Sequence, residues 1–322
     1  MTDGIINVYK ERGFTSHDVV AKLRGILKMK KIGHTGTLDP EAEGVLPVCL
    51  GKATKVCELL TDKEKTYQAV LLLGTVTDTQ DTTGEVLETH PVTCSEEAVR
   101  KAAANFTGDI LQVPPMYSAL KVNGKKLYEL ARQGVEVERK ARPVTIKEIR
   151  IDEIKLPRVT MTVTCSKGTY IRTLCHDIGA SLGCGGCMEK LLRTKVGPFV
   201  LEESVRLSQI EQKRDEGKLE EVIRPTDSVF MKYSALLLNE TGEKAVRNGN
   251  PIRFEAAERE TSAETVIEEY ESGEKNSVTE RSPETAVKDG ERFRIYDAEH
   301  TFLAVYEWRE DKHCLWPVKM FL

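Results

Sequence analysis

The order of apolar and polar positions predicts both strands and helices in the first 200 residues. Apolar runs predict strands at 5–9, 44–50 and 67–74, and alternation of apolar residues with threonine predicts another at 159–165. Thr15-Ser16 can cap a helix, because Val19, Val20, Leu23, Ile26 and Leu27 then recur at helical spacing. These elements mix without the regular alternation of a doubly wound sheet.

Further helices are predicted after residue 93 and from about Arg172 to Leu182, and the segment 188–193 is predicted to start another. Thr93 and Glu96 form a capping box ahead of the first of these, which is rich in alanine. The whole pattern favours an α+β domain built on a mixed or antiparallel sheet.

Two domains are predicted from the length of 322 residues and from a change in pattern near residue 224. Residues 1–224 form the larger domain, with an insertion at about 112–142, and charged residues 211–221 are a candidate linker. Residues 225–322 form a small β-rich domain, with apolar runs at 235–238, 251–254, 293–296, 302–308 and 317–321.

The charge is distributed unevenly. The net charge is −4, but residues 255–291 contain 12 acidic and 4 basic residues, so the rest of the chain is positive. This segment is poor in large apolar residues and predicts a solvated, disordered insert. Local basic clusters elsewhere are compatible with a nucleic-acid partner.

The chain lacks an apolar run of the roughly 20 residues that a membrane span needs, and its start lacks the apolar core of a signal peptide. Its eight cysteines are scattered, unlike a secreted disulfide framework. A cytoplasmic protein without a membrane association is therefore expected.

Two segments partly resemble a phosphate-binding loop and a zinc site, but their residues do not fit either motif. The segment 44–53 has six residues between its glycines and Ala53 where a phosphate loop needs Ser or Thr. Cys184 and Cys187 have zinc-knuckle spacing, but Cys175 and His176 are adjacent and would project in different directions. We expect no metal, and small residues in a tight turn between helices.

The loop 33–47 contains three glycines, two prolines and one aspartate, Asp39, together with His34 and two threonines. Asp39 precedes Pro40, so it can cap the following turn, and loop chemistry alone favours that role. Rigid glycine-rich loops also present catalytic carboxylates. The residues by themselves do not decide between a cap and a nucleophile.

The segment GHTGTLDPEAEGVLP resembles the signature of the TruB family of tRNA pseudouridine synthases, which isomerise uridine 55 in the T-loop. The resemblance continues in order over about 200 residues, through Lys65-Thr66-Tyr67, the segments 74–81 and 114–121, Ser166 to Arg172, and Leu192-Arg193-Thr194. It departs at Glu11, where the family commonly has proline, and at the acidic insert.

The resemblance implies that Asp39 is the nucleophile, that Tyr67 stacks on the target base near the C5 proton, and that Arg172 pairs with Asp39 and keeps it ionised. Without the motif, Tyr67 is better interpreted as a core tyrosine. Tyr170 would line the pocket, on the same face as Arg172 if the preceding strand continues. His34 would fill the space left by the flipped nucleotide, and the other implied pocket neighbours are Lys10 and Leu192.

No cofactor or metal is implied, because isomerisation involves neither a redox step nor transfer to another molecule. The implied partner is the T-arm of tRNA, and the chain is expected to be a monomer with a C-terminal RNA-binding module of the PUA type. RNA contacts are expected from Lys30, Lys31, Lys121, Lys125 and Arg132. The alternatives are a non-catalytic RNA-binding or tRNA-folding protein and a synthase that depends on guide RNA.

Overall fold

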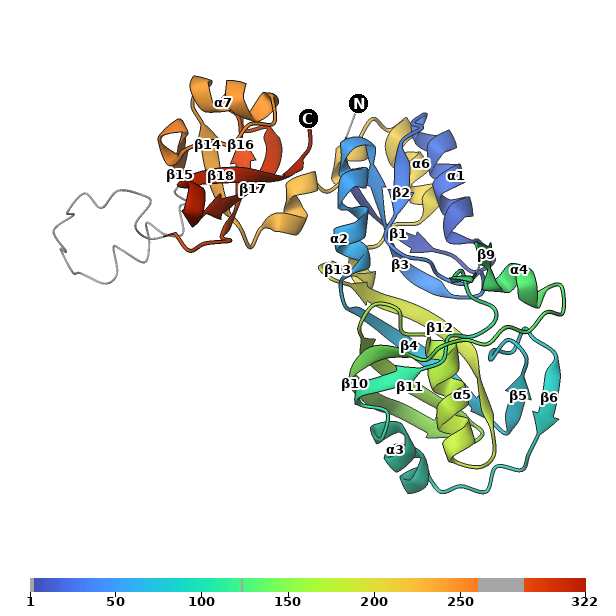
Figure 1. Cartoon of the computed structure of the whole chain (residues 1–322). Helices are drawn as coiled ribbons and strands as arrows, with labels where there is room; N and C mark the ends of the chain where they lie inside the picture. The colour runs from blue at the N-terminus through green and yellow to red at the C-terminus, as the bar shows by residue number, and fades with distance from the viewer. Residues whose placement is uncertain (1–2, 123, 260–286) are drawn as a thin grey trace, which may run out of the picture. The chain divides into compact units, whose positions relative to one another are not determined.

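The computed structural model describes residues 3–122, 124–259 and 287–322, and the chain divides into two compact units, Ile5–Ile223 and Arg224–Leu322. Figure 1 shows a large mixed sheet in the first unit and a small one in the second. The α+β fold predicted from the sequence is confirmed. Among the described residues, no helix is long and apolar enough to cross a membrane.

Nine described strands form the large sheet, with seven in the order β1-β3-β12-β4-β11-β10-β7. Strands β3 and β12 are parallel, whereas β12, β4, β11, β10 and β7 pair antiparallel with their neighbours. The bounds of the strands in this sheet are β1 Gly4–Lys10, β2 Ile32–His34, β3 Glu43–Leu50, β4 Lys65–Leu73, β7 Gly108–Gln112, β10 Arg142–Lys155, β11 Arg158–Cys165, β12 Gly186–Val196 and β13 Phe199–Val200.

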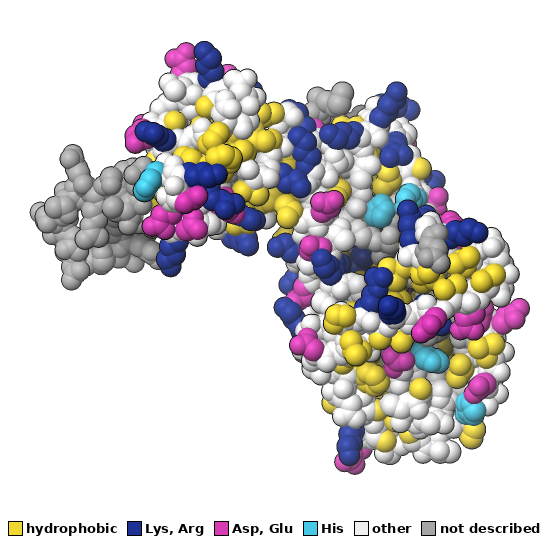
Figure 2. Space-filling model, in the orientation of Figure 1, with side chains coloured by type: hydrophobic (Ala, Val, Ile, Leu, Met, Phe, Trp, Pro, Cys, Tyr) yellow, Lys and Arg dark blue, Asp and Glu magenta, His cyan; other side chains and the backbone are white. Residues whose placement is uncertain are grey.

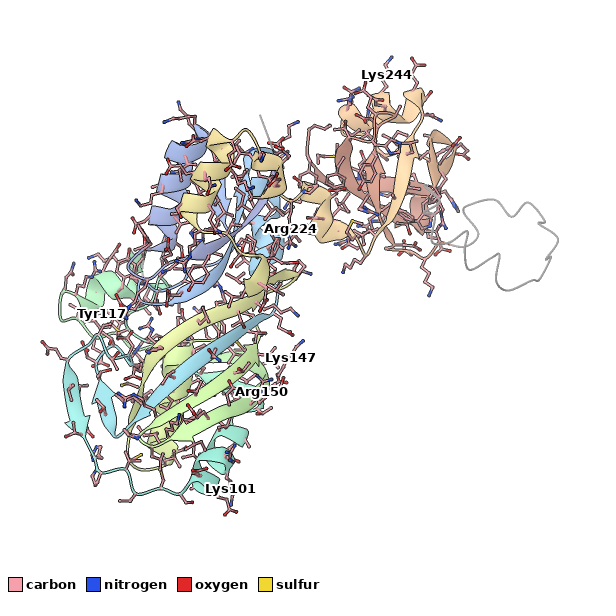
Figure 3. The ribbon with its side chains drawn as sticks, turned by 180° about the vertical axis from the view of Figure 1, so that it is seen from behind. Lys101, Tyr117, Lys147, Arg150, Arg224 and Lys244 are labelled. Carbon is pink, nitrogen blue, oxygen red and sulfur yellow. The ribbon has the colours of Figure 1, made fainter. Side chains whose placement is uncertain are left out.

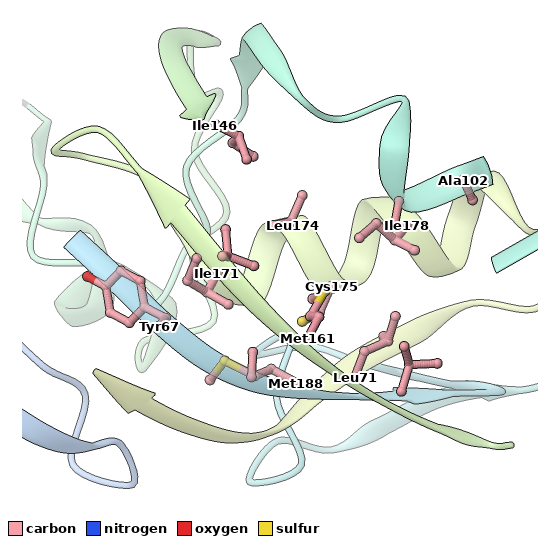
Figure 4. Close-up of a cluster of buried hydrophobic side chains, with 14 of the residues drawn as sticks. Tyr67, Leu71, Ala102, Ile146, Met161, Ile171, Leu174, Cys175, Ile178 and Met188 are labelled. Atoms are coloured by element: carbon pink, nitrogen blue, oxygen red, sulfur yellow. The ribbon is translucent and has the colours of Figure 1, made fainter. Parts of the chain in front are cut away.

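Helices cover this sheet because each buries one apolar face. Helix α1 buries Val19, Val20 and Leu23, and Thr15 caps it as the sequence predicts, in a capping box with Asp18 that was not predicted. Helix α5 packs on β4, β11 and β12 around a cluster that includes Leu71, Met161 and Leu174 (Figure 4). The bounds of the helices are α1 Ser16–Leu27, α2 Cys57–Thr61, α3 Glu96–Ala104, α4 Leu127–Ala131, α5 Ile171–Ser181 and α6 Leu207–Asp215.

Two hairpins extend from this unit. Strands β5, Thr75–Thr77, and β6, Val86–Thr89, form one of them. Strands β8, Lys121–Val122, and β9, Lys125–Lys126, form the other and lead into α4. The second hairpin lies in the predicted insertion, which therefore leaves the sheet at the end of β7 and returns at the start of β10, its antiparallel neighbour.

The second unit is a five-stranded sheet of the described residues, in the order β15-β14-β16-β17-β18, with one helix. Its core contains Phe254, Phe293 and Trp308, whose rings are in contact. The bounds are β14 Ser234–Leu238, α7 Glu240–Arg247, β15 Ala257–Arg259, β16 Arg292–Tyr296, β17 Phe302–Arg309 and β18 Cys314–Met320.

Several local predictions are wrong. The segment 188–193 lies in strand β12, because pairing with β3 and β4 outweighs its helix-like apolar spacing. Ser95 rather than Thr93 caps α3. The segment 251–254 is not a strand: Ile252 makes one isolated bridge and Phe254 begins a short 3₁₀ helix. The turn at Cys184 connects a helix to a strand, not two helices.

The boundaries predicted near the two charged segments also need correction. Residues 211–215 belong to α6, which buries Leu207 and Ile210 and packs against α1, so the charged residues are the solvent face of a helix. Residues 257–259 form β15, and Gly290 donates to the Trp308 carbonyl at 2.9 Å, so both ends of the predicted acidic insert belong to the fold. Its middle, 260–286, lies outside the described residues.

Gly44 marks a close approach of two strands that only glycine permits. Its φ is +104°, and a Cβ atom there would lie 2.2 Å from the carbonyl oxygen of Arg193. We expect Gly44→Ala to lower the free energy of unfolding by at least about 2 kcal/mol. Gly25→Ala, in α1 and facing open space, is the matched control and is expected to stabilise by about 0.5–1 kcal/mol. Urea denaturation of both variants measures the difference.

Candidate active site

The loop that contains Asp39 is held by side chains from outside it. Leu38 is buried, and its backbone N–H donates to Ser16 Oγ, at the start of α1, at 2.9 Å. Gly13 N–H donates to the Pro40 carbonyl at 2.9 Å. Because its neighbours on both sides are fixed in this way, the backbone from which the Asp39 side chain projects has a defined position.

Two buried cations complete this support. Lys10 Nζ donates to the carbonyls of Pro40, at 3.1 Å, and Ala42, at 2.6 Å. Arg193 donates from Nε to the Val45 carbonyl at 2.7 Å. Burial lowers the pKa of Lys10 to about 8. Lys10 is fully buried and secures the loop, and its implied place as a pocket neighbour stays a prediction.

Arg172 pairs with Asp39. The guanidinium Nε lies 2.9 Å from Asp39 Oδ2, and Nη2 donates to Oδ1 at 3.4 Å. Nη1 and Nη2 also donate to the carbonyls of Thr79 at 3.0 Å and Tyr117 at 2.8 Å. The Arg172 side chain is 5% exposed and that of Asp39 is 39% exposed, so a buried, fully engaged cation orients a carboxylate that solvent or a substrate can reach.

This geometry separates the two interpretations of Asp39. The carboxylate contacts Arg172, and Asp39 contributes its backbone carbonyl to the turn that closes at Ala42 N–H. The side chain thus does not serve as the cap that loop chemistry favoured.

Asp81 is a second carboxylate at Arg172 that the sequence interpretation missed. Its Oδ2 lies 3.8 Å from Arg172 Nε, while Oδ1 accepts from Thr79 Oγ1 and from Thr83 N–H at 2.8 and 2.9 Å. The signal was present, because Asp81 ends the segment 74–81 on which the family resemblance rests. It was overlooked because a turn rich in Thr and Asp is usually a local hydrogen-bonded loop, which this one also is.

Tyr67 lies in β4 and is 8% exposed. Its ring packs in the core cluster, and its hydroxyl end points away from the cluster (Figure 4). Burial raises the pKa of Tyr67, while the adjacent Arg193 guanidinium lowers it. The Tyr67 side chain therefore packs in the core, as its position favours, while the charges of Arg193 and Asp39 act on its oxygen.

Tyr170 does not continue a strand. Strand β11 ends at Cys165, and Tyr170 immediately precedes α5, so Arg172 projects from the first turn of a helix. Tyr170 is held by Gln112, which accepts from its N–H at 2.8 Å and donates to its carbonyl at 3.0 Å. The prediction of a shared strand face for Tyr170 and Arg172 is wrong, but the pairing of Arg172 with Asp39 does not depend on it.

His34 ends β2, and its Nδ1 lies 3.2 Å from the Gly36 carbonyl, so the ring is tied to the loop. It is half-buried and contacts the His17 ring edge to face. Burial lowers the pKa of His34, which favours the neutral ring.

Leu191 lines the small pocket at Asp39, and the implied place of Leu192 as a pocket neighbour stays a prediction. Leu191 packs on the core cluster, and Leu192 pairs with Gln68 and Glu43 in the neighbouring strands. The pocket is lined by Arg12, Asp39, Glu41, Ala42, Asp81, Thr82, Thr83, Met188, Glu189 and Leu191.

The predicted RNA-contacting residues Lys30, Lys31, Lys121, Lys125 and Arg132 are all exposed. Figure 2 shows Lys and Arg side chains gathered around the β8–β9 hairpin and α4. Tyr117 lies in the same insertion, close to α4 (Figure 3), and its carbonyl accepts from Arg172. The insertion thus has exposed basic side chains, and its Tyr117 carbonyl helps to hold Arg172 in its pair with Asp39.

The sequence matches two family models. The TruB family pseudouridylate synthase N-terminal domain covers residues 24–171, and the tRNA pseudouridylate synthase B C-terminal domain covers residues 172–231. The chain is 50% identical over 328 residues to tRNA pseudouridine synthase B of Lachnoclostridium phytofermentans, covering 99% of this chain and 100% of that protein.

The chain belongs to the TruB family. A second relative, tRNA pseudouridine synthase B of Alkaliphilus oremlandii, is 50% identical over 250 residues, which are 78% of this chain and 83% of that protein. Membership of this family makes the chain a tRNA pseudouridine synthase, an isomerase. The family predicted from the motifs is confirmed, and the purely non-catalytic alternative is not supported.

Chains in two solved complexes share the fold of this protein. A chain in a Cbf5-Nop10-Gar1 complex matches with a TM-score of 0.68 and 26% identity, covering 99% of this chain and 85% of that one. A chain of an H/ACA RNP bound to a substrate RNA containing 2'-deoxyuridine matches with the same TM-score at 24% identity. The likeness places the TruB family catalytic unit and its smaller C-terminal unit in one fold group with these proteins.

Proposed function

We propose that the substrate is uridine 55 in the T-loop of tRNA and that the Asp39 carboxylate performs the covalent chemistry. The observation that carries this proposal is the Asp39–Arg172 pair, in which a buried arginine with four hydrogen-bond contacts presents a half-exposed carboxylate. Such an arrangement costs desolvation free energy, and tRNA binding alone does not require it.

The reaction balances without a second reactant. The N1–C1′ bond breaks, the base turns, and C5 bonds to C1′, after which C5 loses its proton to solvent and N1 gains one. Asp39 can attack C1′ or the pyrimidine C6, or it can remove a proton from the sugar. All three routes need one oriented carboxylate and neither a metal nor a redox cofactor.

The surrounding residues would hold the flipped nucleotide. Extraction of a base from a loop costs a few kcal/mol, and contact with aromatic rings offsets part of that cost. Tyr67, whose phenol is affected by the charges of Arg193 and Asp39, would accept the C5 proton, and Tyr170 and His34 would contact the base and the space that it leaves. Leu191 would provide an apolar wall.

Tritium release from 5-tritiated uridine in isolated RNA stem-loops tests the substrate assignment. Release from a T-arm stem-loop is expected, and no release is expected from an anticodon stem-loop or from a T-arm in which uridine 55 alone is unlabelled. Equal release from both arms would exclude T-arm specificity.

The basic insertion is proposed to bind the RNA backbone, and the C-terminal unit to act as a PUA-type RNA-binding module. We expect Lys121→Gln and Lys125→Gln each to reduce the slope of log K against log salt concentration by about 0.9 for tRNA binding. Lys101→Gln, on α3 and far from the insertion in Figure 3, is the control and is expected to leave the slope unchanged. Filter binding over a salt series measures all three, and an unchanged slope in the insertion variants would remove this surface from the interface.

A further inference from the structure

Arg193 is the largest fully buried side chain in the described residues, and its charge has no obvious counterpart. It forms no ion pair with any carboxylate that the structure describes. A buried guanidinium without a counter-ion is costly, because the charge loses its hydration without gaining an opposite charge. Its position therefore calls for a function.

Part of that function is support of the Asp39 loop. Nε donates to the Val45 carbonyl at 2.7 Å and Nη1 to the Thr37 carbonyl at 3.4 Å, so the guanidinium holds the loop on both sides of Asp39. The backbone of Arg193 also forms the surface against which Gly44 packs. These contacts use two nitrogens of the three.

The third nitrogen, Nη2, is buried and makes no hydrogen bond of normal geometry among the described residues. A looser side-chain contact between Arg193 and the Tyr67 phenol raises the pKa of Arg193 and lowers that of Tyr67. Arg193 is the register partner of Tyr67 across β12 and β4, so the two side chains start from Cβ atoms roughly 5 Å apart on one face. The charge of Arg193 acts on the pKa of the Tyr67 phenol in the direction opposite to burial.

We propose that Arg193 is a positioning residue that stabilises the ionised Tyr67 oxygen, so that Tyr67 can accept the C5 proton. This inference rests on the proposed role of Tyr67. The C5–H electron pair re-forms the ring double bond, the proton passes to the Tyr67 oxygen and then to water, and the negative charge that Tyr67 carries before the transfer lies beside the Nη2 edge.

No other described cation is as well placed to serve. Among the groups that act on Tyr67 or Arg193, Asp39 and Cys165 make ionisation of the phenol harder, and Lys10 and Lys65 hold backbone carbonyls of their own. Burial lowers the pKa of Arg193 itself, and a phenolate partner would offset that. The groups around the pair are Asp39, Cys165, Lys10, Lys65 and His34.

The test compares Arg193→Gln, which keeps amide donors for the loop carbonyls but removes the charge, with Arg193→Lys, which keeps the charge. Single-turnover tritium release is measured over a pH series. In Arg193→Gln the pH at which the rate of tritium release rises is expected to increase by at least about one pH unit. Near neutral pH this shift lowers the rate about tenfold. In Arg193→Lys the rise is expected to stay close to the wild-type position.

Difluorotyrosine placed at position 67 provides the rescue, because fluorine makes the phenol more acidic. In Arg193→Gln, difluorotyrosine is expected to return the rise of the rate of tritium release to lower pH. If the glutamine variant fails to fold, the same measurement is made in Arg193→Lys. Equal losses in both variants with an unmoved profile, or no rescue, would overturn the inference and leave Arg193 a structural residue. Full activity of Tyr67→Phe would instead overturn the proposed role of Tyr67, so the two failures are distinguishable.

Discussion

Asp39→Asn is expected to lower the rate of tritium release from T-arm RNA by roughly 10⁴-fold or more, in line with the loss of a nucleophile in other enzymes. The amide has nearly the shape of the carboxylate but neither its charge nor its nucleophilicity. Arg172 and the loop contacts of Lys10 and Ser16 do not depend on the charge for their position, so the variant is expected to fold.

Binding of tRNA by Asp39→Asn is expected to match or slightly exceed that of the wild type, because a negative charge near phosphate is removed. Asp62→Asn is the control: Asp62 is exposed, follows α2 and pairs with Lys167 at 2.7 Å. Its rate is expected to be unchanged. A rate for Asp39→Asn within tenfold of the wild type would show that another group does the chemistry.

Arg172→Ala is expected to lose activity and stability together. Two carboxylates, Asp39 and Asp81, would lose their cation, and the carbonyls of Thr79 and Tyr117 would lose their donors. Removal of one partner of a buried pair costs about 3–5 kcal/mol, and we expect the lower end because Asp39 is partly exposed. The rate of tritium release is expected to fall about 10²–10³-fold, because the carboxylate is no longer oriented.

A double-mutant cycle separates these effects. Asp81 takes no part in the proposed chemistry. Combining Asp81→Asn with Arg172→Ala is therefore expected to restore part of the free energy of unfolding that Arg172→Ala loses, but little of the rate of tritium release. Arg158→Ala breaks an exposed pair with Glu189 and is expected to cost less than about 1 kcal/mol. If Arg172→Ala lowered the free energy of unfolding no more than Arg158→Ala does, the role given to the Asp39–Arg172 pair would be contradicted.

The sequence predicted those elements whose signals are local. The helix cap at Thr15 and the apolar runs at β3, β4 and β11 need only neighbouring residues, and the structure confirms them. Strand β12 was mistaken for a helix because its identity depends on pairing with β3 and β4, which are about 120–150 residues away in sequence.

The site was predicted only as far as motifs could name its residues. The pairing of Asp39 with Arg172 followed from the family resemblance and is present in the structure. The burial of Lys10, the second carboxylate Asp81 and the Nη2 edge of Arg193 were not predicted. Each is a property of how distant segments pack, and none leaves a periodic or compositional trace along the chain.

Mapping of pseudouridine in a full-length tRNA transcript tests the central claim most directly. The transcript is incubated with wild-type protein or Asp39→Asn, and pseudouridine is located by sequencing after chemical modification. A single pseudouridine at position 55 is expected with the wild type and none with Asp39→Asn. A modified position elsewhere in the tRNA, or pseudouridine at position 55 with Asp39→Asn, would contradict it.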